Sequence, residues 1–379
     1  MKAYIVNGLR TAVGRANKGI FKSLRSDDLA VNVIDSLLKS VPKLDPKEVD
    51  DLIVGCAYPE GEQGLQMGRL ISLMALPINV PGFIVNRFCA SGLEAIAIAT
   101  QRIEAGMADV IIAGGTESMS RIPRNGYHPS ANPQLKLNHP DYLISMGLTA
   151  ENVAKKYRIN REDQDIYSYH SHLKANIALN SELFKNEIVP IEHNGVLHDI
   201  DECPRPSTSP EILATLAPAF KENGVVTAGN SSPMNDGASF VIVMSEKMIK
   251  RLGIIPKSRM LSYAIIGVDP AIMGVGPIEA IPRALKKAGL NLSDIDLIEL
   301  NEAFAAQTLA VIRELRLDPH KINVNGGAIA LGHPLGATGA KLTTQLMNEM
   351  IRKKHKYGMV TACVGGGQGV AGIFENLKL

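Results

Sequence analysis

The sequence predicts a duplicated α/β fold that carries an inserted loop segment. Two observations point to this fold. Apolar runs typical of buried strands alternate with helical patterns along most of the 379 residues. In addition, three features of the first third of the chain return in the same order in the last third. A chain of this length exceeds one ordinary core, so we expect two or three domains.

The first elements are predicted from apolar runs and their breakers. Met1–Gly8 has no apolar signal region or small-residue cleavage site, so it indicates a first strand rather than a secretion signal. Ser91–Ala105 is an apolar helical segment stopped by Gly106. Asp109–Gly115 is a short apolar run closed by two glycines, which is typical of a buried strand.

The internal repeat rests on three pairs of segments. Val49–Val54 resembles Ile295–Leu300, at an offset of 246 residues. The pair Val85-Asn86, ahead of a glycine-containing turn and a helix, has its counterpart in Val324-Asn325, 239 residues later. The run that starts at Val110 and ends in glycines returns from Met359, after 249 residues. Order and spacing both hold, so we interpret the halves as a duplication related by a pseudo-two-fold axis.

A different segment separates the two halves. Residues 119–234 are rich in proline and loops, with helices predicted after Thr149 and from Asn160 as N-cap. The predicted division is an N-terminal half over 1–118 and 235–256, an inserted loop domain over 119–234, and a C-terminal half over 257–379. Long insertions of this kind are usually functional.

Composition narrows the functional classes. A formal net charge of +2, with no block of like charges, gives no reason to expect nucleic-acid binding. No segment is long and apolar enough to suggest membrane insertion. Four scattered cysteines are too few for a disulfide framework or a zinc site, so a reducing, cytoplasmic location is expected.

Cys89 is the first candidate for chemistry. It lies between a strand ending near Asn86 and a helix starting near Ser91, where unpaired backbone N–H groups would stabilise a thiolate and lower its pKa. Ser91 and Gly92 would allow a substrate to approach closely. From this location alone, a nucleophile and a small buried structural cysteine remain equal alternatives.

Cys363 is the second candidate, because it ends a strand and precedes a run of glycines. Backbone N–H groups in such a run, including that of Gly365, can point at an oxyanion without interference from a Cβ. Gly367–Gly372 formally matches a dinucleotide-binding fingerprint, but only seven residues follow it. These leave no room for the helix, second strand and acidic partner that such a site requires.

His333 and Asn301 complete the set. His333 lies among glycines, which suits a base in a narrow cleft, although a structural histidine is the alternative. Asn301 follows the predicted strand Leu297–Leu300, where its amide could orient a water molecule or donate to an oxyanion. The neighbouring Glu302 is equally consistent with a structural anchor. In a duplicated fold, these residues, Cys89 and Cys363 could converge on one cleft.

These segments resemble the signatures of the thiolase family, and the resemblance runs from Lys2 to the C-terminus. Six segments match in the family's order: VNRFCASGL (Val85–Leu93), MGLTAEN (Met146–Asn152), TAGNSS (Thr227–Ser232), NEAFA (Asn301–Ala305), GHP (Gly332–Pro334) and CVGGGQG (Cys363–Gly369).

The resemblance implies that the two halves form a five-layered αβαβα core, and it also implies a role for each candidate. Cys89 would carry the acyl group, His333 would be the base for Cys89 and for the CoA thiol, and Cys363 would exchange a proton with the α-carbon of acetyl-CoA. One oxyanion hole would consist of His333 and a water held by Asn301, and the other of the N–H groups of Cys89 and Gly365. The contacts with CoA would come from the inserted domain and its flank, through Arg205, Ser232 and Met146.

The resemblance also implies a reaction and its partners. The expected activity is thiolytic cleavage of 3-ketoacyl-CoA in fatty-acid β-oxidation, with CoA and acyl-CoA as substrates and products and no resident cofactor. A homodimer or homotetramer is expected, as are β-oxidation enzymes as partners. An acetyl-CoA C-acetyltransferase making acetoacetyl-CoA is the alternative; Ser145 and the context of Cys89 (Arg87-Phe88) favour the former. A non-catalytic lipid carrier and a Cys–His hydrolase are alternatives of other classes.

Some features depart from the family or have ordinary interpretations. Pro233 stands where relatives often carry glycine, and the segment Ile191–Pro206 is short, which bears on acyl-chain preference and CoA contacts. Cys56 is interpreted as a core residue and Cys203 as a loop thiol. His170 and His172 do not share a helix face, so we expect them to be solvent-exposed rather than metal ligands.

Overall fold

The structure is a computed structural model that describes residues 2–379. Met1, part of the predicted first strand and of the predicted first half, lies outside the described residues. The strands are β1 (Ala3–Thr11), β2 (Gly14–Arg15), β3 (Asp51–Gly55), β4 (Gly82–Val85), β5 (Val110–Ser118), β6 (Ile188–Val189), β7 (Ile191–His193), β8 (Val196–His198), β9 (Asn235–Ser245), β10 (Ser258–Gly267), β11 (Leu297–Leu300), β12 (Tyr357–Val364) and β13 (Gln368–Asn376).

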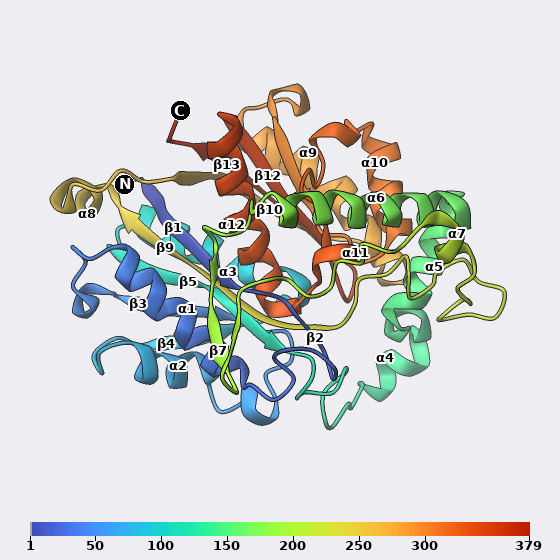
Figure 1. Ribbon diagram of the computed structural model, residues 1–379, viewed down its shortest axis with the longest axis horizontal. Helices are drawn as coiled ribbons and strands as arrows, with labels where there is room; N and C mark the ends of the chain where they lie inside the picture. Colours follow the sequence, from blue (N-terminus) through green and yellow to red (C-terminus); the bar gives the residue numbers. More distant parts are fainter. Residues whose placement is uncertain (1) are drawn as a thin grey trace.

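Helices connect these strands and cover them (Figure 1). The α-helices are α1 (Ser26–Ser40), α2 (Met67–Ala75), α3 (Ser91–Glu104), α4 (Pro133–Asn138), α5 (Met146–Lys156), α6 (Arg161–Asn180), α7 (Pro210–Ala214), α8 (Glu246–Leu252), α9 (Gly276–Ala288), α10 (Ala305–Leu315), α11 (Ala328–Leu331) and α12 (Leu335–Lys353). Short 3₁₀ turns are Pro46–Glu48, Gly61–Gln63, Phe88–Ala90, Pro140–Leu143, Pro270–Val275, Leu292–Asp294 and Pro319–Lys321. Among the described residues, no helix is long and apolar enough to cross a membrane.

Strand order confirms the duplication. The first half runs β1-β9-β5-β3-β4 and the second runs β10-β13-β12-β11. Corresponding pairs have the same sense: β3 and β5 are parallel, as are β11 and β12, whereas β9 and β13 run antiparallel to both of their neighbours. The two halves join where β1 pairs antiparallel with β10, at Ile5 and Ser258.

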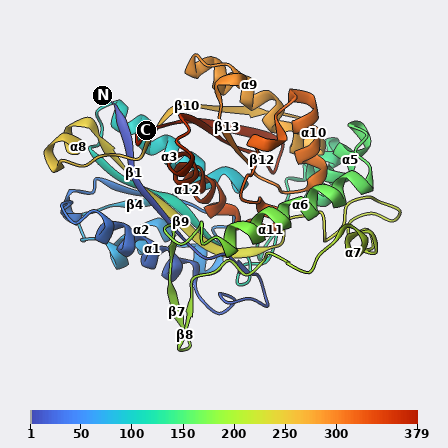
Figure 2. The same ribbon diagram turned by 45° about the horizontal axis from the view of Figure 1, so that its top comes forward.

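The predicted five layers are also present. Helices α1 and α2 cover the outer face of the first sheet, α3 and α12 lie between the two sheets, and α9 and α10 lie outside the second (Figures 1 and 2). Alternate residues of β5 enter different cores: Val110 and Ile112 pack outward, while Ile111 and Ala113 face α3 and α12. The helices α3 and α12 are therefore buried between two apolar sheet faces.

One strand of the first half has no full counterpart in the second. Val324 and Asn325 form a turn, and only an isolated bridge joins Ile298 to Ile322 where β4 would have its equivalent. The side-chain amide of Asn323 replaces the missing strand: its Nδ2 donates to the carbonyl of Leu300, and its Oδ1 accepts from the N–H of the same residue, both at 2.9 Å. Asn323 adopts a positive φ of 43° in doing so.

Most predicted helix limits hold within one or two residues, with one correction. Helix α3 ends at Glu104, close to the predicted stop at Gly106, and the Asn160 side chain caps α6 by accepting from the N–H of Asp163 at 2.7 Å. Helix α5 begins at Met146 rather than after Thr149. The Ser145 hydroxyl accepts from the N–H of Leu148 at 3.4 Å, so Ser145 is the cap that sets the earlier start.

Buried polar contacts fasten the segment 119–234 to both halves. Arg10 of β1 is 1% exposed and pairs with Glu187 and Asp201, each at 2.8 Å. On the other side, Glu302 accepts from the hydroxyls of Tyr167 and Ser171 on α6, at 2.9 and 2.7 Å. Breaking such buried pairs leaves uncompensated charge, so these contacts fix the position of the segment.

Candidate active site

Cys89 lies in the 3₁₀ turn Phe88–Ala90, which runs directly into α3. Phe88 has a positive φ of 40°, an uncommon conformation for a bulky residue. Two side chains hold this turn: Asn86 Oδ1 accepts from the N–H of Phe88 at 2.9 Å, and the Ser91 hydroxyl donates to the Phe88 carbonyl at 2.7 Å. The sharp turn leaves Cys89 partly exposed.

The pKa of Cys89 moves in the direction opposite to the sequence prediction. Burial raises the pKa of the thiol to about 11, although N–H groups of Gly365 and of Cys89 itself oppose this rise. The predicted backbone donors are therefore present, but desolvation outweighs them. With this pKa, the Cys89 thiol is neutral near pH 7.

Cys363 and the glycine run after β12 lie beside Cys89. The backbone N–H of Gly365 favours the thiolate form of Cys89. Burial, together with the negative charge that a Cys89 thiolate carries, raises the pKa of Cys363 far above that of an ordinary thiol. Arg87 contacts the end of the same run, donating to Gln368 at 2.6 Å while it pairs with Glu94 of α3 at 2.7 Å. The two cysteines therefore belong to one site, although they come from different halves.

His333 and Asn301 are in direct contact. Asn301 Nδ2 lies 3.3 Å from His333 Nε2, and both side chains are buried. The other imidazole nitrogen, Nδ1, lies 2.6 Å from the hydroxyl of Thr338 in the first turn of α12. Burial lowers the pKa of His333 to about 3, with the Lys341 charge as a second cause, so the imidazole is neutral near pH 7.

Side chains of the first half hold the loop that carries His333. Asn235 Oδ1, at the start of β9, accepts from the N–H of His333 at 2.8 Å. Glu117 Oε2, at the end of β5, accepts from the N–H of Gly336 at 2.9 Å. Sequence inspection missed Asn235, Glu117 and Thr338, because no local pattern relates them to His333.

Helices α3 and α12 cross in backbone contact, which places the two loops side by side. A Cβ on Gly92 would lie 2.8 Å from the N of Ala340 and 2.9 Å from the O of Gly336, and one on Gly339 would lie 2.2 Å from the N of Leu93. Gly92 therefore admits a neighbouring helix rather than a substrate, contrary to the sequence prediction. Cys89 and His333 each precede this crossing by a few residues.

Glu302 is a structural anchor, one of the two alternatives considered for it. It is 1% exposed and accepts from Tyr167, Ser171, Asn323 Nδ2 and the N–H of Ile329. These partners come from α6, from the turn between Pro319–Lys321 and α11, and from α11 itself. Glu302, the residue that follows Asn301, thus ties α6 of the segment 119–234 to the second half.

The three predicted CoA contacts lie at different distances from the candidate catalytic residues. Met146 begins α5, and its sulfur would be 3.4 Å from a Cβ placed on Gly365. The N–H of Ser232 donates to the carbonyl of Ala303 at 3.0 Å, two residues after Asn301. Arg205 is exposed and lies farther along, where it lines a small cavity of about 20 Å³ with His172 and Cys203. Met146 and Ser232 therefore adjoin the catalytic candidates, and Arg205 lies at the edge.

His172 is buried, in contrast to the prediction that it is solvent-exposed. It is 4% exposed, and its Nδ1 accepts from the N–H of Arg205 at 3.2 Å, while His170 is exposed. The packing of α6 against the following loop covers His172, and burial lowers its pKa to about 4. Within residues 2–379, no group of three or more His, Cys, Asp or Glu side chains could hold a metal ion.

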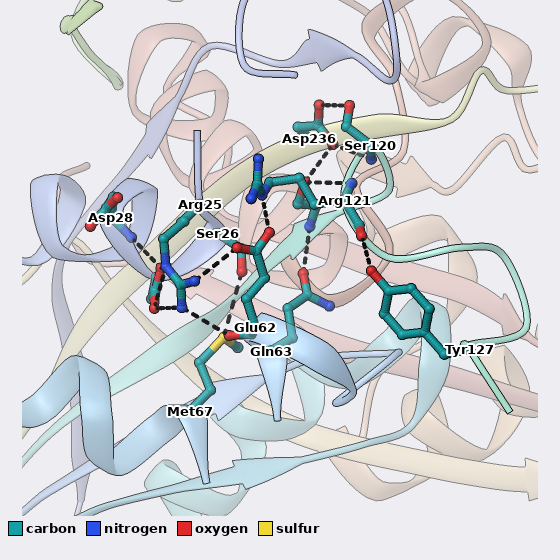
Figure 3. A network of polar contacts seen from close by, with 12 residues as sticks. Arg25, Ser26, Asp28, Glu62, Gln63, Met67, Ser120, Arg121, Tyr127 and Asp236 are labelled. Atoms are coloured by element: carbon teal, nitrogen blue, oxygen red, sulfur yellow. Dashed lines mark hydrogen bonds and ion pairs between the residues drawn. The ribbon is translucent and has the colours of Figure 1, made fainter. Parts of the chain in front are cut away.

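Figure 3 shows a polar network of the first half that includes Arg25, Glu62, Gln63 and Arg121. Glu62 pairs with Arg25 at 2.8 Å and with Arg121, and the neighbouring Gln63 donates to Glu117 at 2.7 Å. An open depression of about 450 Å³ lies over this network, lined by Lys22, Glu62, Ser120, Arg121 and Tyr127. None of the predicted site residues lines this depression. Cys56, interpreted as a core residue, is fully buried beside Glu117.

Comparisons with known proteins cover nearly the whole chain. Residues 3–247 match the family described as thiolase, N-terminal domain, and residues 254–376 match thiolase, C-terminal domain. The chain is 50% identical to a 3-ketoacyl-CoA thiolase of Bacillus subtilis over 99% of each chain. It is 45% identical to the 3-ketoacyl-CoA thiolase FadA of Escherichia coli over 98% of this chain and 99% of the relative. A crystal structure of the Bacillus anthracis acetyl-CoA acetyltransferase superposes with a TM-score of 0.91, at 39% identity over 99% of each chain.

Proposed function

The chain belongs to the thiolase family, and from that premise we propose that its active site cleaves 3-ketoacyl-CoA with CoA to give acetyl-CoA and a shortened acyl-CoA. The observation that carries this proposal is the arrangement of two pairs, Cys89 with Cys363 and His333 with Asn301, around the crossing of α3 and α12. The sequence resemblance is confirmed at the level of the family and of an acyltransferase enzyme.

Cys89 and His333 perform the first step. The neutral His333 takes the Cys89 proton at Nε2, and the sulfur attacks the C3 carbonyl of the substrate. Because a raised thiol pKa and a lowered imidazole pKa disfavour a resting ion pair, proton transfer accompanies the attack rather than preceding it. The N–H groups of Cys89 and Gly365, which already reach the sulfur, become donors to the oxygen that gains charge there.

Cleavage then needs a second acid. When the C2–C3 bond breaks, its electron pair remains on the acetyl-CoA fragment as an enolate. His333, Asn301 and a water held at Asn301 stabilise the enolate oxygen; Asn301 Oδ1 is a buried acceptor without a protein partner among the described residues. The Cys363 thiol gives its proton to C2, which completes acetyl-CoA.

The remaining steps restore both thiols. His333 passes its proton to Cys363, takes the proton of the incoming CoA thiol, and finally returns a proton to Cys89 as the acyl group moves to CoA. Every proton is accounted for by the two enzyme thiols, the imidazole and CoA. The chemistry therefore requires no resident cofactor, and CoA acts as substrate and product.

The segment 119–234 is proposed as the CoA-binding part of the enzyme, inserted between the halves 1–118 with 235–256 and 257–379. Its support is the position of Met146 beside Gly365, of Ser232 beside Ala303, and of the cation Arg205 at the outer edge. This order would place the CoA thiol near the cysteines and its phosphates toward Arg205. Arg205→Ala should raise the KM for CoA several-fold and leave kcat within a factor of two.

Acetoacetyl-CoA synthesis is the second candidate, and the similarity to the B. anthracis acetyl-CoA acetyltransferase favours it. The curated relatives at higher identity are named 3-ketoacyl-CoA thiolases, which favours cleavage of longer substrates. We would measure thiolysis of acetoacetyl-CoA and of a long-chain 3-ketoacyl-CoA side by side. A kcat/KM at least tenfold higher for the long substrate is expected, and the reverse ratio would favour the acetyltransferase.

A direct test separates an enzyme from a non-catalytic carrier. Incubation with acetyl-CoA, followed by mass spectrometry of the peptide that contains Cys89, should show an acetyl thioester. The Cys89→Ser protein, which keeps the rest of the site, is the control for nonspecific acetylation. If CoA binds but the wild-type peptide carries no acetyl group, the enzymatic function is wrong.

A homodimer or a dimer of dimers is proposed from an apolar surface at the edge of the first sheet. The outermost strand of the first sheet is β4, and α2 with its flanks lies next to it. Four apolar side chains of this region are exposed: Leu65 (91%), Leu73 (46%), Met74 (53%) and Ile78 (80%). A second copy would cover this surface. Leu73→Glu combined with Met74→Glu should shift the mass in light scattering to that of the monomer, and an unchanged mass would exclude this surface.

A cytoplasmic location and cooperation with other β-oxidation enzymes complete the proposal. Support for the location comes from the four free cysteines, since an unprotected thiol nucleophile suits a reducing compartment. The chemistry supports the cooperation, because the 3-keto group of the substrate must come from the oxidation of a 3-hydroxyacyl-CoA.

A further inference from the structure

Gln307, in the first turn of α10, contacts the sulfur of Cys363. Its Oε1 lies 3.6 Å from Cys363 Sγ, and the Gln307 side chain is fully buried. Among the described residues, this carboxamide oxygen is the only side-chain partner found for the Cys363 thiol. Cys363 itself is also fully buried, so the contact is shielded from solvent.

The orientation of the Gln307 amide is fixed by a second bond. The N–H of Ala303 donates to the same Oε1 at 3.1 Å, and an N–H can only be matched by an oxygen. The amide therefore cannot flip to present Nε2 to the sulfur. Nε2 is buried without a partner among residues 2–379, which shows that the orientation is kept at some cost.

An oxygen acceptor acts differently on the two forms of Cys363. It accepts a hydrogen bond from the thiol S–H, and its lone pairs repel a thiolate. The contact therefore favours the protonated form and aims its hydrogen along one direction. Capping of α10 by Gln307 would account for the bond to Ala303, but it does not account for the contact with the sulfur.

We propose that Gln307 is a positioning residue that holds Cys363 as an oriented acid for the enolate produced by thiolysis. This inference rests on the proposed function. In the step concerned, the S–H bond of Cys363 breaks, its hydrogen leaves as a proton, the electron pair of the enolate forms the new C–H bond, and sulfur keeps its own pair as a thiolate. Gln307 gains and loses no proton; it sets where the thiol hydrogen points and how readily the thiolate forms.

The test uses the exchange of acetyl-CoA methyl protons with D₂O, in which Cys363 must act as a base. Exchange by the wild-type enzyme should rise with pH as the Cys363 thiolate forms. Gln307→Met removes the acceptor at similar size, so its rising limb should move to lower pH by about half a unit to one unit, the scale of one hydrogen bond. Gln307→Glu keeps an oxygen and the cap while adding charge, so its limb should move to higher pH.

The rate at which acetyl-CoA acetylates Cys89 serves as the internal control, and it should change less than twofold in both variants. Opposite shifts of the exchange limb with preserved acetylation support the proposal. Two results would overturn the proposal and leave Gln307 as a helix cap. One is an exchange limb that coincides with the wild type in both variants, and the other is a parallel fall of acetylation and exchange. Absence of Cys89 acetylation in the wild type would instead disprove the proposed function.

Discussion

The hydroxyl of Thr338 lies 2.6 Å from Nδ1 of His333. The same hydroxyl donates its single proton to the carbonyl of Pro334 at 2.8 Å, so it can only accept from the imidazole. Nδ1 therefore carries the proton, and the lone pair is on Nε2, where Asn301 Nδ2 can donate to it at 3.3 Å. Thr338 thus selects the tautomer in which His333 can act as a base.

Thr338→Val, which keeps the shape and removes the hydroxyl, should slow acetylation of Cys89 by acetyl-CoA about tenfold, the scale of one lost hydrogen bond. The KM should stay unchanged, because Thr338 is 1% exposed and its hydroxyl is occupied by His333 and Pro334. Thr338→Ser is the matched control and should acetylate near the wild-type rate. Single-turnover measurements of acetylation provide the rates, and equal rates for the valine and serine proteins would contradict the tautomer argument.

The raised pKa of Cys89 predicts how the thiol reacts with pH. With a pKa of about 11, and with a histidine whose pKa is about 3, no thiolate–imidazolium pair exists near neutrality. The rate of Cys89 alkylation by iodoacetamide should therefore rise roughly tenfold per pH unit between pH 7 and 10, as the thiolate fraction does. The Cys89→Ser protein shows which part of the alkylation comes from Cys89. A plateau that starts below pH 8 would show an ion pair instead.

Substitutions of the two cysteines should affect different half-reactions, acetylation in one case and α-proton exchange in the other. Cys89→Ser should lose acetylation by acetyl-CoA, because the soft thiolate that attacks the carbonyl is gone. Cys363→Ala should still be acetylated at Cys89, but should exchange α-protons of acetyl-CoA at less than about 1% of the wild-type rate, in line with losing a general acid/base. Isotope exchange followed by mass spectrometry measures both. If Cys363→Ala retained the exchange, another residue would have to carry the proton.

His172 predicts a loss of stability in acid. Its pKa is lowered to about 4 in the folded protein, against 6.5 in an unfolded chain, so below pH 6.5 only the unfolded state gains the proton. The free energy of unfolding is unaffected by His172 above pH 6.5 and decreases as the pH falls toward 4. At pH 5 the loss of stability amounts to about 2 kcal/mol.

His172→Asn, whose Oδ1 can replace Nδ1 as acceptor for the N–H of Arg205, should therefore lose less stability between pH 7 and pH 5 than the wild type. Urea unfolding at both values provides the comparison. Because His333 stays in both proteins, its own acid sensitivity cancels. An equal loss in the two proteins would mean that His172 is not kept neutral by folding.

Sequence inspection could identify residues whose position along the chain reflects their role. Cys89 and Asn301 each follow a strand, Cys363 lies at the end of one, and His333 stands among glycines, so local pattern and family resemblance together point to them. The duplication itself could be predicted for the same reason, since the repeat keeps its order and spacing. The predicted counterpart of Val85-Asn86 at Val324-Asn325 is a turn rather than the end of a strand, because a single side chain, Asn323, replaces backbone pairing there.

Other features depend on contacts between distant parts of the chain. Glu117 and Gly336 are 219 residues apart, and Asn235 is 98 residues from His333, so no local pattern can relate them. The direction of the Cys89 pKa depends on a competition between burial and backbone donors, and burial is known only once both halves are packed. His172 escaped prediction for the same reason, because its cover comes from a loop more than thirty residues away.

The crossing of α3 and α12 has a mechanical consequence. Side chains in contact can change rotamer and absorb a small displacement, whereas two backbones in contact cannot adjust in this way. Because Gly92 and Gly339 put main chain against main chain, the spacing between the two loops beyond them has the stiffness of the helices themselves. Thermal motion that loosens the outer layers would leave this spacing unchanged, and so would substitutions in those layers. The reacting groups keep their alignment because two side chains are missing.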